Sequence, residues 1–411
     1  MRFKIKIGVI GLGYVGLPLA LEFGKYFTTI GYDNDFSRVN LLKKGKDKNK
    51  EFSKKKIFSS KKLFLTNNKK LLSDLDFYII TVPTPVSKNK KPDLRILKKA
   101  TELVSNYLNP KKKSIIVYES TVYPGCTREI CVPLVEKKSN LIANKDFFYG
   151  YSPERINPGS TKHTIANIKK IISGSNKKTL DRIYFVYKKI IKAGIYKCKS
   201  IEVAEGAKVI ENTQRDVNIA LVNELCQLFN KLGINFKQVL SAASTKWNFL
   251  NFYPGLVGGH CVGVDPYYLA FKAKEKKFDP KMILSGRKTN EDYSNFLVKL
   301  VKKNLKKRKN KILISGTTFK PNCSDVRNSK VIDIYNSLKK NNTVHIIDEV
   351  ANKKDFKNYY GFKIYDKEKL KKNFYDCFIC AVDHDKMKNF NHNNKSKFMK
   401  NKFFNLNINE L

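Results

Sequence analysis

Short apolar runs, each closed by glycine or polar residues, alternate along the chain with stretches of helical periodicity. The first run covers residues 4–10 and leads directly into Gly-Leu-Gly-Tyr-Val-Gly at 11–16, after which apolar positions recur at helical spacing from Leu17. A second apolar run ends at Asp33. A strand, a glycine-rich turn, a helix and a second strand in this order are typical of a doubly wound parallel sheet.

The alternation continues to the end of the chain. Strands of the buried type begin near Phe77 and Ser114, and a proline-free helical stretch runs from Ile201 to Gly233. We therefore predict an α/β fold with two Rossmann-like, doubly wound domains joined by a long helix and a central helical domain. The expected later elements are helix to about Lys307, strands at 311–317, 343–348 and 375–383, and a helix at 329–340. The predicted domains are 1–198, 199–308 and 309–411.

The glycine-rich turn has the spacing of a dinucleotide site. Gly11 is expected to make the tight turn, Gly13 to let the backbone approach a pyrophosphate, and Gly16 to pack the helix on the sheet. Asp33, about 20 residues further on, is placed to bind the adenosine ribose, which favours NAD over NADP. The nearby Arg38 leaves that preference open.

Hydroxyl residues follow the next two strands. Ligands of a doubly wound sheet lie at the carboxyl ends of its strands, so Thr84 and Thr121 are expected at the cofactor or the reacting centre. The alternative is that they only cap the helices that follow. The predicted cofactor contacts are Gly11, Gly13, Tyr14, Val15, Gly16, Asp33, Arg38, Thr84 and Thr121.

The net charge is unusually high, at +45, because 81 Lys and Arg residues face 36 Asp and Glu residues. The lysines are spread over the whole length, and runs such as 54–56 and 111–113 are expected in loops. This favours a solvated basic surface over a nucleic-acid partner. A basic binding protein that keeps only the fold remains a distant alternative.

The eight cysteines show no regular spacing. Such usage, in a chain without a secretory pattern at its start or an apolar run of about 18 residues, favours a soluble protein in the reducing cytoplasm, with no membrane partner. Cys377 and Cys380 have CxxC spacing but fall inside a predicted strand, so we expect them in the core. No metal site is predicted.

Cys261 lies in a glycine-lined turn, within Gly-Leu-Val-Gly-Gly-His-Cys-Val-Gly-Val-Asp-Pro at 255–266. A thiol there, with Asp265 four residues later, fits a catalytic nucleophile, although most cysteines are small core residues. On the long helix, Lys208, Asn212 and Arg215 share one face. Small and apolar neighbours around Lys208 indicate that its side chain points into a cleft.

Taken in order, the glycine turn, Ser-Pro-Glu154-Arg155, Lys208-x3-Asn212 and Gly-Gly-His-Cys-x3-Asp resemble the UDP-glucose/GDP-mannose dehydrogenase family over nearly the full length. Residues 211–220, 244–250 and 260–269 are most similar to the Vi-polysaccharide-type branch that acts on UDP-N-acetylglucosamine or UDP-N-acetylgalactosamine. Enzymes specific for UDP-glucose usually carry lysine just before the aspartate of the cysteine motif. This chain has Val264 there.

The resemblance implies two successive NAD-dependent oxidations at the sugar C6, for surface polysaccharide biosynthesis. Lys208 and Asn212 would stabilise the oxyanion, and Cys261 would form a thiohemiacetal and then a thioester. Asp265 and Glu154 would activate or order the hydrolytic water, with Thr121 helping to hold it. The implied catalytic residues are Cys261, Lys208, Asn212, Asp265, Glu154 and Thr121.

The resemblance also implies a UDP-sugar partner and a homodimer, with the central helical domain as the dimerisation domain. In the family, an arginine from the region of Arg287 reaches the partner subunit's site. The implied substrate contacts are Arg155, Ile156, Lys208, Asn212, Arg215, Gly258, Arg287, Lys320 and Arg327.

Two departures from the family pattern concern the uridine end, where Pro321 and Ser324 replace a usual glutamate and a common proline. The alternatives within the family are UDP-glucose and UDP-N-acetylmannosamine 6-dehydrogenases. Outside it, a 3-hydroxyacyl or 6-phosphogluconate-type dehydrogenase shares the first domain and the long helix but needs no thiol.

Overall fold

A computed structural model describes residues 5–49, 51–156, 164–305 and 309–407, with side chains up to residue 400. The chain divides into two compact units. The N-terminal unit comprises residues 1–211 and 267–278, and the C-terminal unit comprises 212–266 and 279–411. We describe each unit by itself.

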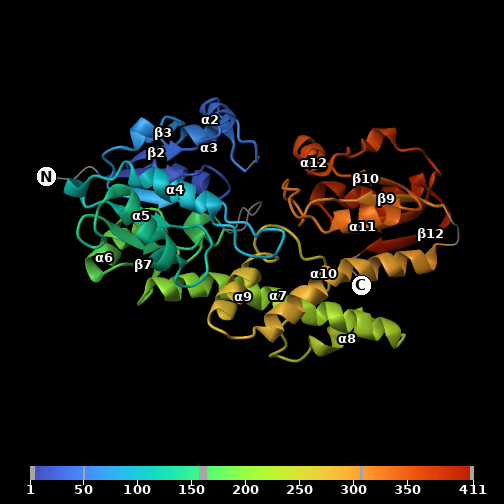
Figure 1. Ribbon diagram of the computed structural model, residues 1–411. Coiled ribbons are helices and arrows are strands. Elements are labelled where there is room, and N and C mark those ends of the chain that lie inside the picture. Colours follow the sequence, from blue (N-terminus) through green and yellow to red (C-terminus); the bar gives the residue numbers. More distant parts are fainter. Residues whose placement is uncertain (1–4, 50, 157–163, 306–308, 408–411) are drawn as a thin grey trace. The chain divides into compact units, whose positions relative to one another are not determined.

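An eight-stranded sheet forms the centre of the N-terminal unit (Figure 1). Its order is β3-β2-β1-β4-β5-β6-β7-β8, and every neighbouring pair is parallel except β6 and β7. The chain order reverses between β1 and β4, which creates the switch point where such sheets bind ligands. The strands are β1 (Lys6–Ile10), β2 (Thr28–Tyr32), β3 (Leu63–Thr66), β4 (Phe77–Ile80), β5 (Ile115–Tyr118), β6 (Phe148–Tyr151), β7 (Lys170–Gly174) and β8 (Ile195–Lys197).

Helices pack around this sheet and bury its apolar strands, as in other parallel sheets. In α4, Leu97, Ala100, Thr101 and Val104 are buried at helical spacing. The helices are α1 (Gly16–Phe23), α2 (Phe36–Lys43), α3 (Lys54–Phe58), α4 (Arg95–Ser105), α5 (Val132–Ser139) and α6 (Lys177–Lys188).

The lysine runs expected in loops are partly helical, so that prediction was wrong. Residues 54–56 begin α3, where the Ser53 hydroxyl accepts a hydrogen bond from the Lys56 N–H and Ile57 is buried. Residues 110–112 form a 3-10 turn. A capping serine and one buried isoleucine suffice to order a short helix whose lysines remain in solvent.

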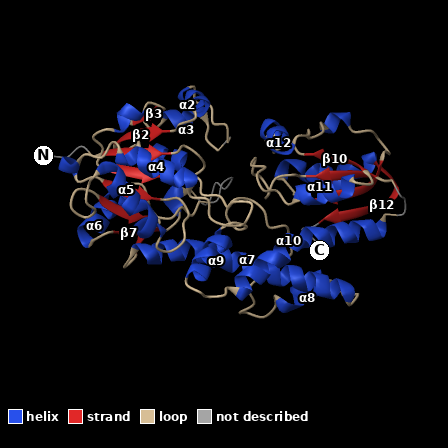
Figure 2. Cartoon of the chain, viewed as in Figure 1, coloured by secondary structure: helices blue, strands red, loops and turns tan. Residues whose placement is uncertain are grey.

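The long helix is confirmed as α7 (Ile201–Lys231), and the boundary between the units falls within it, after Glu211. It is followed by α8 (Phe236–Ala243), α9 (Asp265–Glu275) and α10 (Lys281–Asn304). Figure 2 shows this segment as helices and loops without strands.

The C-terminal unit contains a parallel sheet of order β10-β9-β11-β12, with β9 (Lys311–Ser315), β10 (Thr343–Ile347), β11 (Tyr375–Cys380) and β12 (Met399–Asn407). Its helices include α11 (Val331–Lys339) and α12 (Lys353–Tyr360). Cys377 and Cys380 are buried in β11, which confirms their predicted place in the core.

The two sheets share a detail at the first turn. Asp33 Oδ2 accepts a hydrogen bond from Leu12 N, and Asp348 Oδ2 accepts one from Thr317 N, each at 2.7 Å. In both cases the carboxylate follows the second strand of the unit and ties it to the end of the first strand. The second Rossmann-like half predicted from the alternation of apolar runs is therefore present.

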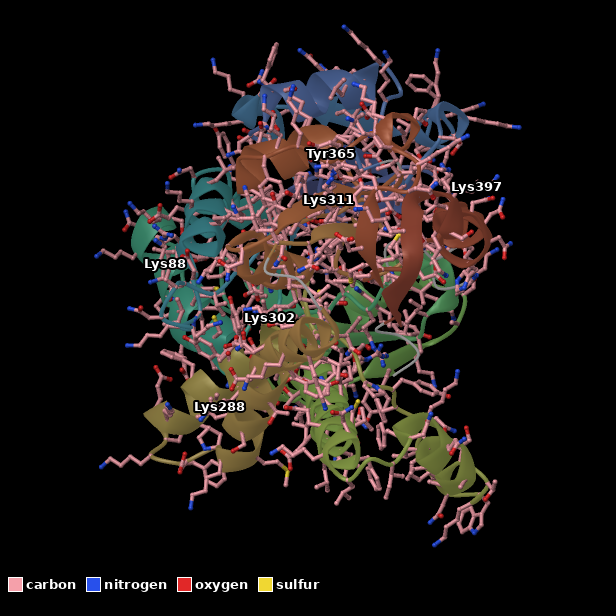
Figure 3. The ribbon with its side chains drawn as sticks, turned by 90° about the vertical axis from the view of Figure 1, so that its right-hand side faces the viewer. Lys88, Lys288, Lys302, Lys311, Tyr365 and Lys397 are labelled. Carbon is pink, nitrogen blue, oxygen red and sulfur yellow. The ribbon has the colours of Figure 1, made fainter. Side chains whose placement is uncertain are left out.

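Basic side chains project outward from helices and loops of both units (Figure 3). Lys88 and Lys288, which are labelled there, are exposed members of separate segments. Within the described residues, no helix has the length and apolar character needed to cross a membrane.

Candidate active site

The glycine turn after β1 has the geometry of a phosphate-binding turn. Gly11 has φ +94°, and its N–H donates to Tyr32 O at 2.8 Å. A Cβ on Gly16 would lie 1.8 Å from Gly11 O, whereas one on Gly13 would meet no atom within 4 Å. The first and third glycines therefore fold the turn against α1, and the second leaves its surface open to a ligand. This fits a pyrophosphate at the N-terminus of α1, with Tyr14 and Val15 in the same turn.

Asp33 and Arg38 lie beside the turn. Asp33 accepts hydrogen bonds from two backbone N–H groups, those of Leu12 and Asp35. The buried Arg38 donates to Leu12 O at 3.0 Å and pairs with Asp47 at 2.7 Å. The positive charge of Arg38 is thus matched by an internal carboxylate, which favours NAD over a 2′-phosphorylated cofactor.

Thr84 and Thr121 meet at the carboxyl ends of β4 and β5. The Thr84 hydroxyl donates to Thr121 O at 2.7 Å, and the Tyr268 hydroxyl donates to Thr84 O at 2.9 Å. Neither threonine caps a helix in the way that Ser53 caps α3. Tyr268 holds the Thr84 backbone in place through this hydrogen bond, and it was not predicted as a site residue from the sequence.

Glu154 lies just after β6 and is nearly buried, at 9% exposed. Its Oε1 accepts hydrogen bonds from the backbone N–H groups of Arg155 and Ile156. The Arg155 guanidinium pairs with Glu211 at 2.7 Å and donates to Lys169 O at 2.9 Å. Arg155 is thereby attached to α7, and the backbone of 155–156 orients the Glu154 carboxylate.

The three predicted site residues on one face of α7 differ in how exposed they are. Lys208 is 8% exposed, Asn212 is partly exposed, and Arg215 is exposed. The buried position of Lys208 agrees with the prediction that its side chain points away from bulk water.

Cys261 differs from the other cysteines because it is partly exposed, whereas the remaining seven are buried. The residues just before Cys261 are hydrogen-bonded to the segment between β9 and α11. Asn328 Nδ2 donates to Gly259 O at 2.7 Å, and Gly259 N donates to Asn328 O at 3.1 Å. Gly259 has φ +79°, and a Cβ on Gly258 would lie 2.6 Å from Asn328 O. Glycines are therefore required for this close approach.

Asp265 begins α9 directly after the cysteine loop. Its backbone N–H donates to Cys261 O at 2.8 Å, and Asn212 Nδ2 donates to its Oδ2 at 2.5 Å. The carboxylate is 1% exposed. Three predicted catalytic residues, Asn212, Cys261 and Asp265, are thus joined within the C-terminal unit.

Lys320 and Arg327, which were predicted to contact the nucleotide, follow β9 in the C-terminal unit and are both partly exposed. Arg327 forms a bidentate pair with Asp325, and His260 lies 3.5 Å from the same carboxylate. Burial raises the pKa of Asp325, but the hydrogen bonds and charge of Arg327 outweigh it and leave that pKa lowered. The ionised Asp325 thus orients Arg327 beside the cysteine loop.

Arg287 lies in the interior of α10, at 2% exposed, and pairs with the buried Asp216 of α7. Asn290 donates to both Asp216 O and Oδ1 at 2.8 Å, and Asn223 donates to Asn290 Oδ1 at 2.8 Å. Sequence reasoning missed Asp216, Asn223 and Asn290, since nothing in the helical pattern distinguishes a buried polar position from a solvated one.

Among the described residues, no group of three or more His, Cys, Asp or Glu side chains is arranged to hold a metal ion.

Family models match the chain in three consecutive segments of the UDP-glucose/GDP-mannose dehydrogenase family. The NAD binding domain matches residues 5–191, the central domain 202–292 and the UDP binding domain 313–406.

Full-length relatives agree. A UDP-N-acetyl-D-glucosamine 6-dehydrogenase of Salmonella typhi is 48% identical over 94% of this chain and 91% of its own length. An enzyme of the same name from Pseudomonas aeruginosa is 47% identical over 96% of this chain and 94% of its own length. The solved structure of UDP-D-ManNAc dehydrogenase from Pyrococcus horikoshii superposes with TM-score 0.86 at 28% identity, covering 99% of both chains. The chain belongs to the UDP-glucose/GDP-mannose dehydrogenase family and is an NAD-dependent oxidoreductase.

Proposed function

We propose that this enzyme oxidises C6 of a UDP-N-acetylhexosamine, UDP-N-acetylglucosamine or UDP-N-acetylgalactosamine, to the uronic acid, for surface polysaccharide biosynthesis. The observation that carries the proposal is that Cys261 is the one partly exposed cysteine, in a loop that also leads into the buried Asp265. The names of the relatives at 47% and 48% identity support an N-acetylglucosamine substrate.

The first half of the reaction converts the C6 alcohol to an aldehyde. The residues that would hold NAD are Gly11, Gly13, Tyr14, Val15, Gly16 and Asp33, with Arg38 beside the turn and Thr84 and Thr121 at the strand ends. When bound, the cofactor would supply the hydride acceptor for each oxidation. The Lys208 ammonium, with the Asn212 amide, stabilises the C6 oxyanion as the hydroxyl proton passes to water and the hydride leaves C6. The low exposure of Lys208 strengthens this interaction, since little water competes for the ammonium.

The second half is covalent. The Cys261 sulfur adds to the aldehyde carbon and the thiol proton passes to the oxygen, which forms a thiohemiacetal. Loss of the second hydride leaves a thioester. Water then adds to the thioester carbon and the Cys261 thiol leaves with a proton, releasing the carboxylate.

Hydrolysis needs a group that orders the water and takes its proton. Asp265 and Glu154 are the candidates, and Thr121 helps to hold the water. The backbone donors to Glu154 and the Asn212 donor to Asp265 support carboxylates in fixed orientations.

The resemblance to the family supports the following substrate contacts. Arg155, Ile156, Lys208, Asn212, Arg215 and Gly258 would contact the sugar and diphosphate, and Lys320 and Arg327 the nucleotide side, because guanidinium and ammonium groups suit phosphates. The three domains that we propose comprise residues 1–198, 199–308 and 309–411.

We also propose a cytoplasmic homodimer. The apolar side chains of Leu221, Leu228, Trp247 and Leu250 are between 48% and 91% exposed, which supports a second copy at the central segment. All eight cysteines are free, which suits a reducing compartment. Arg287 is held by Asp216 of its own chain, and its contribution to a partner's site stays a prediction.

A substrate panel tests the assignment. UDP-GlcNAc, UDP-GalNAc, UDP-ManNAc and UDP-Glc are each incubated with NAD and compared by kcat/KM from absorbance at 340 nm. We expect one of the first two to be preferred. A clear preference for UDP-Glc or UDP-ManNAc would place the enzyme in another branch of the family.

The covalent mechanism is tested by stoichiometry. Wild type should form two NADH per UDP-sugar, and Cys261→Ser should fall below two because no thioester can form. Cys198→Ala is the matched control, since Cys198 is buried and burial raises the pKa of its thiol. A Cys261→Ser enzyme that still forms two NADH at the wild-type rate would exclude the thioester.

A further inference from the structure

A buried lysine lies between two carboxylates behind Glu154. Lys170 Nζ donates to Glu119 Oε2 at 2.6 Å and to Pro153 O at 3.0 Å, and it lies 3.7 Å from Glu154 Oε2. The Lys170 and Glu119 side chains are 5% and 0% exposed. The other Glu119 oxygen accepts a hydrogen bond from the Tyr187 hydroxyl of α6. The reaction proposed above uses neither Lys170 nor Glu119.

The topology of the sheet explains how these residues meet. Glu119 and Glu154 follow β5 and β6, which are parallel, so both carboxylates lie at the same edge of the sheet. Strand β7 is antiparallel to β6, so its first residue, Lys170, lies at that edge as well. A buried ammonium with two carboxylates is costly compared with apolar side chains of similar volume, and the strands would pack without it. Its presence at the ligand edge points to a role in the site.

We propose that Lys170 and Glu119 are positioning residues for Glu154. The Lys170 ammonium ties the segment 153–154 to β7 through Pro153 O and attracts Glu154 Oε2, while Glu119 holds the ammonium in place. The inference rests on the proposed role of Glu154 in the reaction.

The charge state of Glu119 links this arrangement to pH. Burial raises the pKa of Glu119 to about 7, with the negative charge of Glu154 acting in the same direction, against the lowering effects of Lys170 and Tyr187. Within residues 5–156 and 164–305, apart from residue 50, these three side chains are the titratable groups that act on it. Below about pH 7, Glu119 gains a proton, and the attraction between its carboxylate and the Lys170 ammonium is lost. Above it, the ammonium is shared between two carboxylates.

A pH series tests this link. Wild-type kcat should contain an ionisation near pH 7. In Glu119→Gln that ionisation should disappear, because the amide does not titrate. In Tyr187→Phe it should move to higher pH, because a donor that favours the carboxylate is removed. An unchanged profile in Glu119→Gln would overturn the inference.

Substitutions of Lys170 test the positioning itself. We expect Lys170→Met to lower kcat about a hundredfold, as a misplaced group does, with little change in the KM for UDP-sugar. Lys170→Arg, which keeps the charge, should restore a large part of kcat. If Lys170→Met does not fold, Lys170→Met with Glu119→Leu removes both buried charges and should fold with the same loss. Wild-type kcat in either folded variant would overturn the inference.

Glu154→Gln distinguishes the proposed role of Glu154 in the reaction from the positioning role of Lys170 and Glu119. If this variant keeps wild-type kcat, the proposed part of Glu154 in the reaction fails, whatever Lys170 does. If it loses kcat while the Lys170 and Glu119 variants behave as wild type, only the positioning role is excluded.

Discussion

Asn212 Nδ2 lies 2.5 Å from Asp265 Oδ2, which links the long helix α7 to the first residue of α9. Asp265 also donates its backbone N–H to Cys261 O. The Cys261 backbone carbonyl, the Asp265 carboxylate and the Asn212 amide are therefore joined through Asp265, although 53 residues separate Asn212 from Asp265. A catalytic carboxylate held in this way acts from a fixed position, which lowers the entropic cost of the reaction.

We expect Asp265→Asn to slow the last step of the reaction most. The amide keeps the shape of the side chain but cannot take a proton from water, so thioester hydrolysis should fall by about a hundredfold or more. Rapid-quench mass spectrometry should then show the sugar attached to Cys261 after a burst of NADH. Asn212→Ala, which removes the hydrogen bond to Asp265 but keeps a carboxylate that can take the proton, should accumulate less adduct. Absence of any adduct in Asp265→Asn would assign the water to another group.

The glycine turn offers a matched pair of substitutions. Gly13→Ala should leave stability unchanged or raise it by up to about 1 kcal/mol, since its Cβ meets no atom within 4 Å. It should weaken NAD binding about tenfold or more, because the methyl group occupies space needed by the pyrophosphate; tenfold corresponds to about 1.4 kcal/mol.

Gly16→Ala should show the opposite behaviour. Its Cβ would lie 1.8 Å from Gly11 O, so the backbone must shift, at a cost of about 1 to 3 kcal/mol of stability. Urea denaturation and NAD titration of both variants check the pair. A stable Gly16→Ala protein would contradict the packing described here.

The Arg287 and Asp216 pair should be important for stability. Arg287→Met leaves the Asp216 carboxylate buried without its cation, which costs about 3 to 5 kcal/mol. Burial already raises the pKa of Asp216, and Arg287 opposes that rise, so the loss should be larger at pH 8 than at pH 5. Lys288→Met is the control, because Lys288 is the exposed neighbour on the same helix (Figure 3). It should change stability by less than about 0.5 kcal/mol.

Glu205 should make stability depend on pH. Its carboxylate is buried and accepts hydrogen bonds from Gly125 N at 2.6 Å and Thr127 N at 2.9 Å, and burial raises its pKa to about 7. A raised pKa in the folded state favours folding at low pH. The free energy of unfolding should therefore fall between about pH 4.5 and pH 7, by up to about 3 kcal/mol from this group.

Glu205→Gln should remove that part of the pH dependence, as measured by urea denaturation at pH 5 and pH 8. Glu202→Gln serves as the control, since Glu202 is more exposed and pairs with Arg128 at the surface. An equal pH dependence in wild type and Glu205→Gln would show that the carboxyl group is not the one that titrates.

The alternation of apolar runs with helical periodicity was sufficient to predict α7, the glycine turn and part of each sheet, namely β1, β2, β4 and β5 in the first and β9, β10 and β11 in the second. Parallel strands are buried on both faces, so their sequences are continuously apolar and easy to recognise. The bounds of α7 differ from the predicted stretch only at its last turn, because Gly233 ends the periodicity but does not itself continue the helix. The lysine run at 54–56 was misplaced because charge predicts exposure and not secondary structure.

The sequence by itself also predicted the residues of the proposed chemistry: a thiol in a glycine loop, a lysine and asparagine one turn apart, and a nucleotide-binding turn. Motif spacing carries such information because each motif lies on one short segment. Only the tertiary structure decided which polar groups are buried together, such as Arg287 with Asp216 and Lys170 with Glu119. Arg287 and Asp216 are 71 residues apart, and their pairing depends on the packing of α10 against α7. Lys170 and Glu119 are 51 residues apart, and their pairing depends on the reversed direction of β7. Neither feature can be predicted from a local sequence pattern.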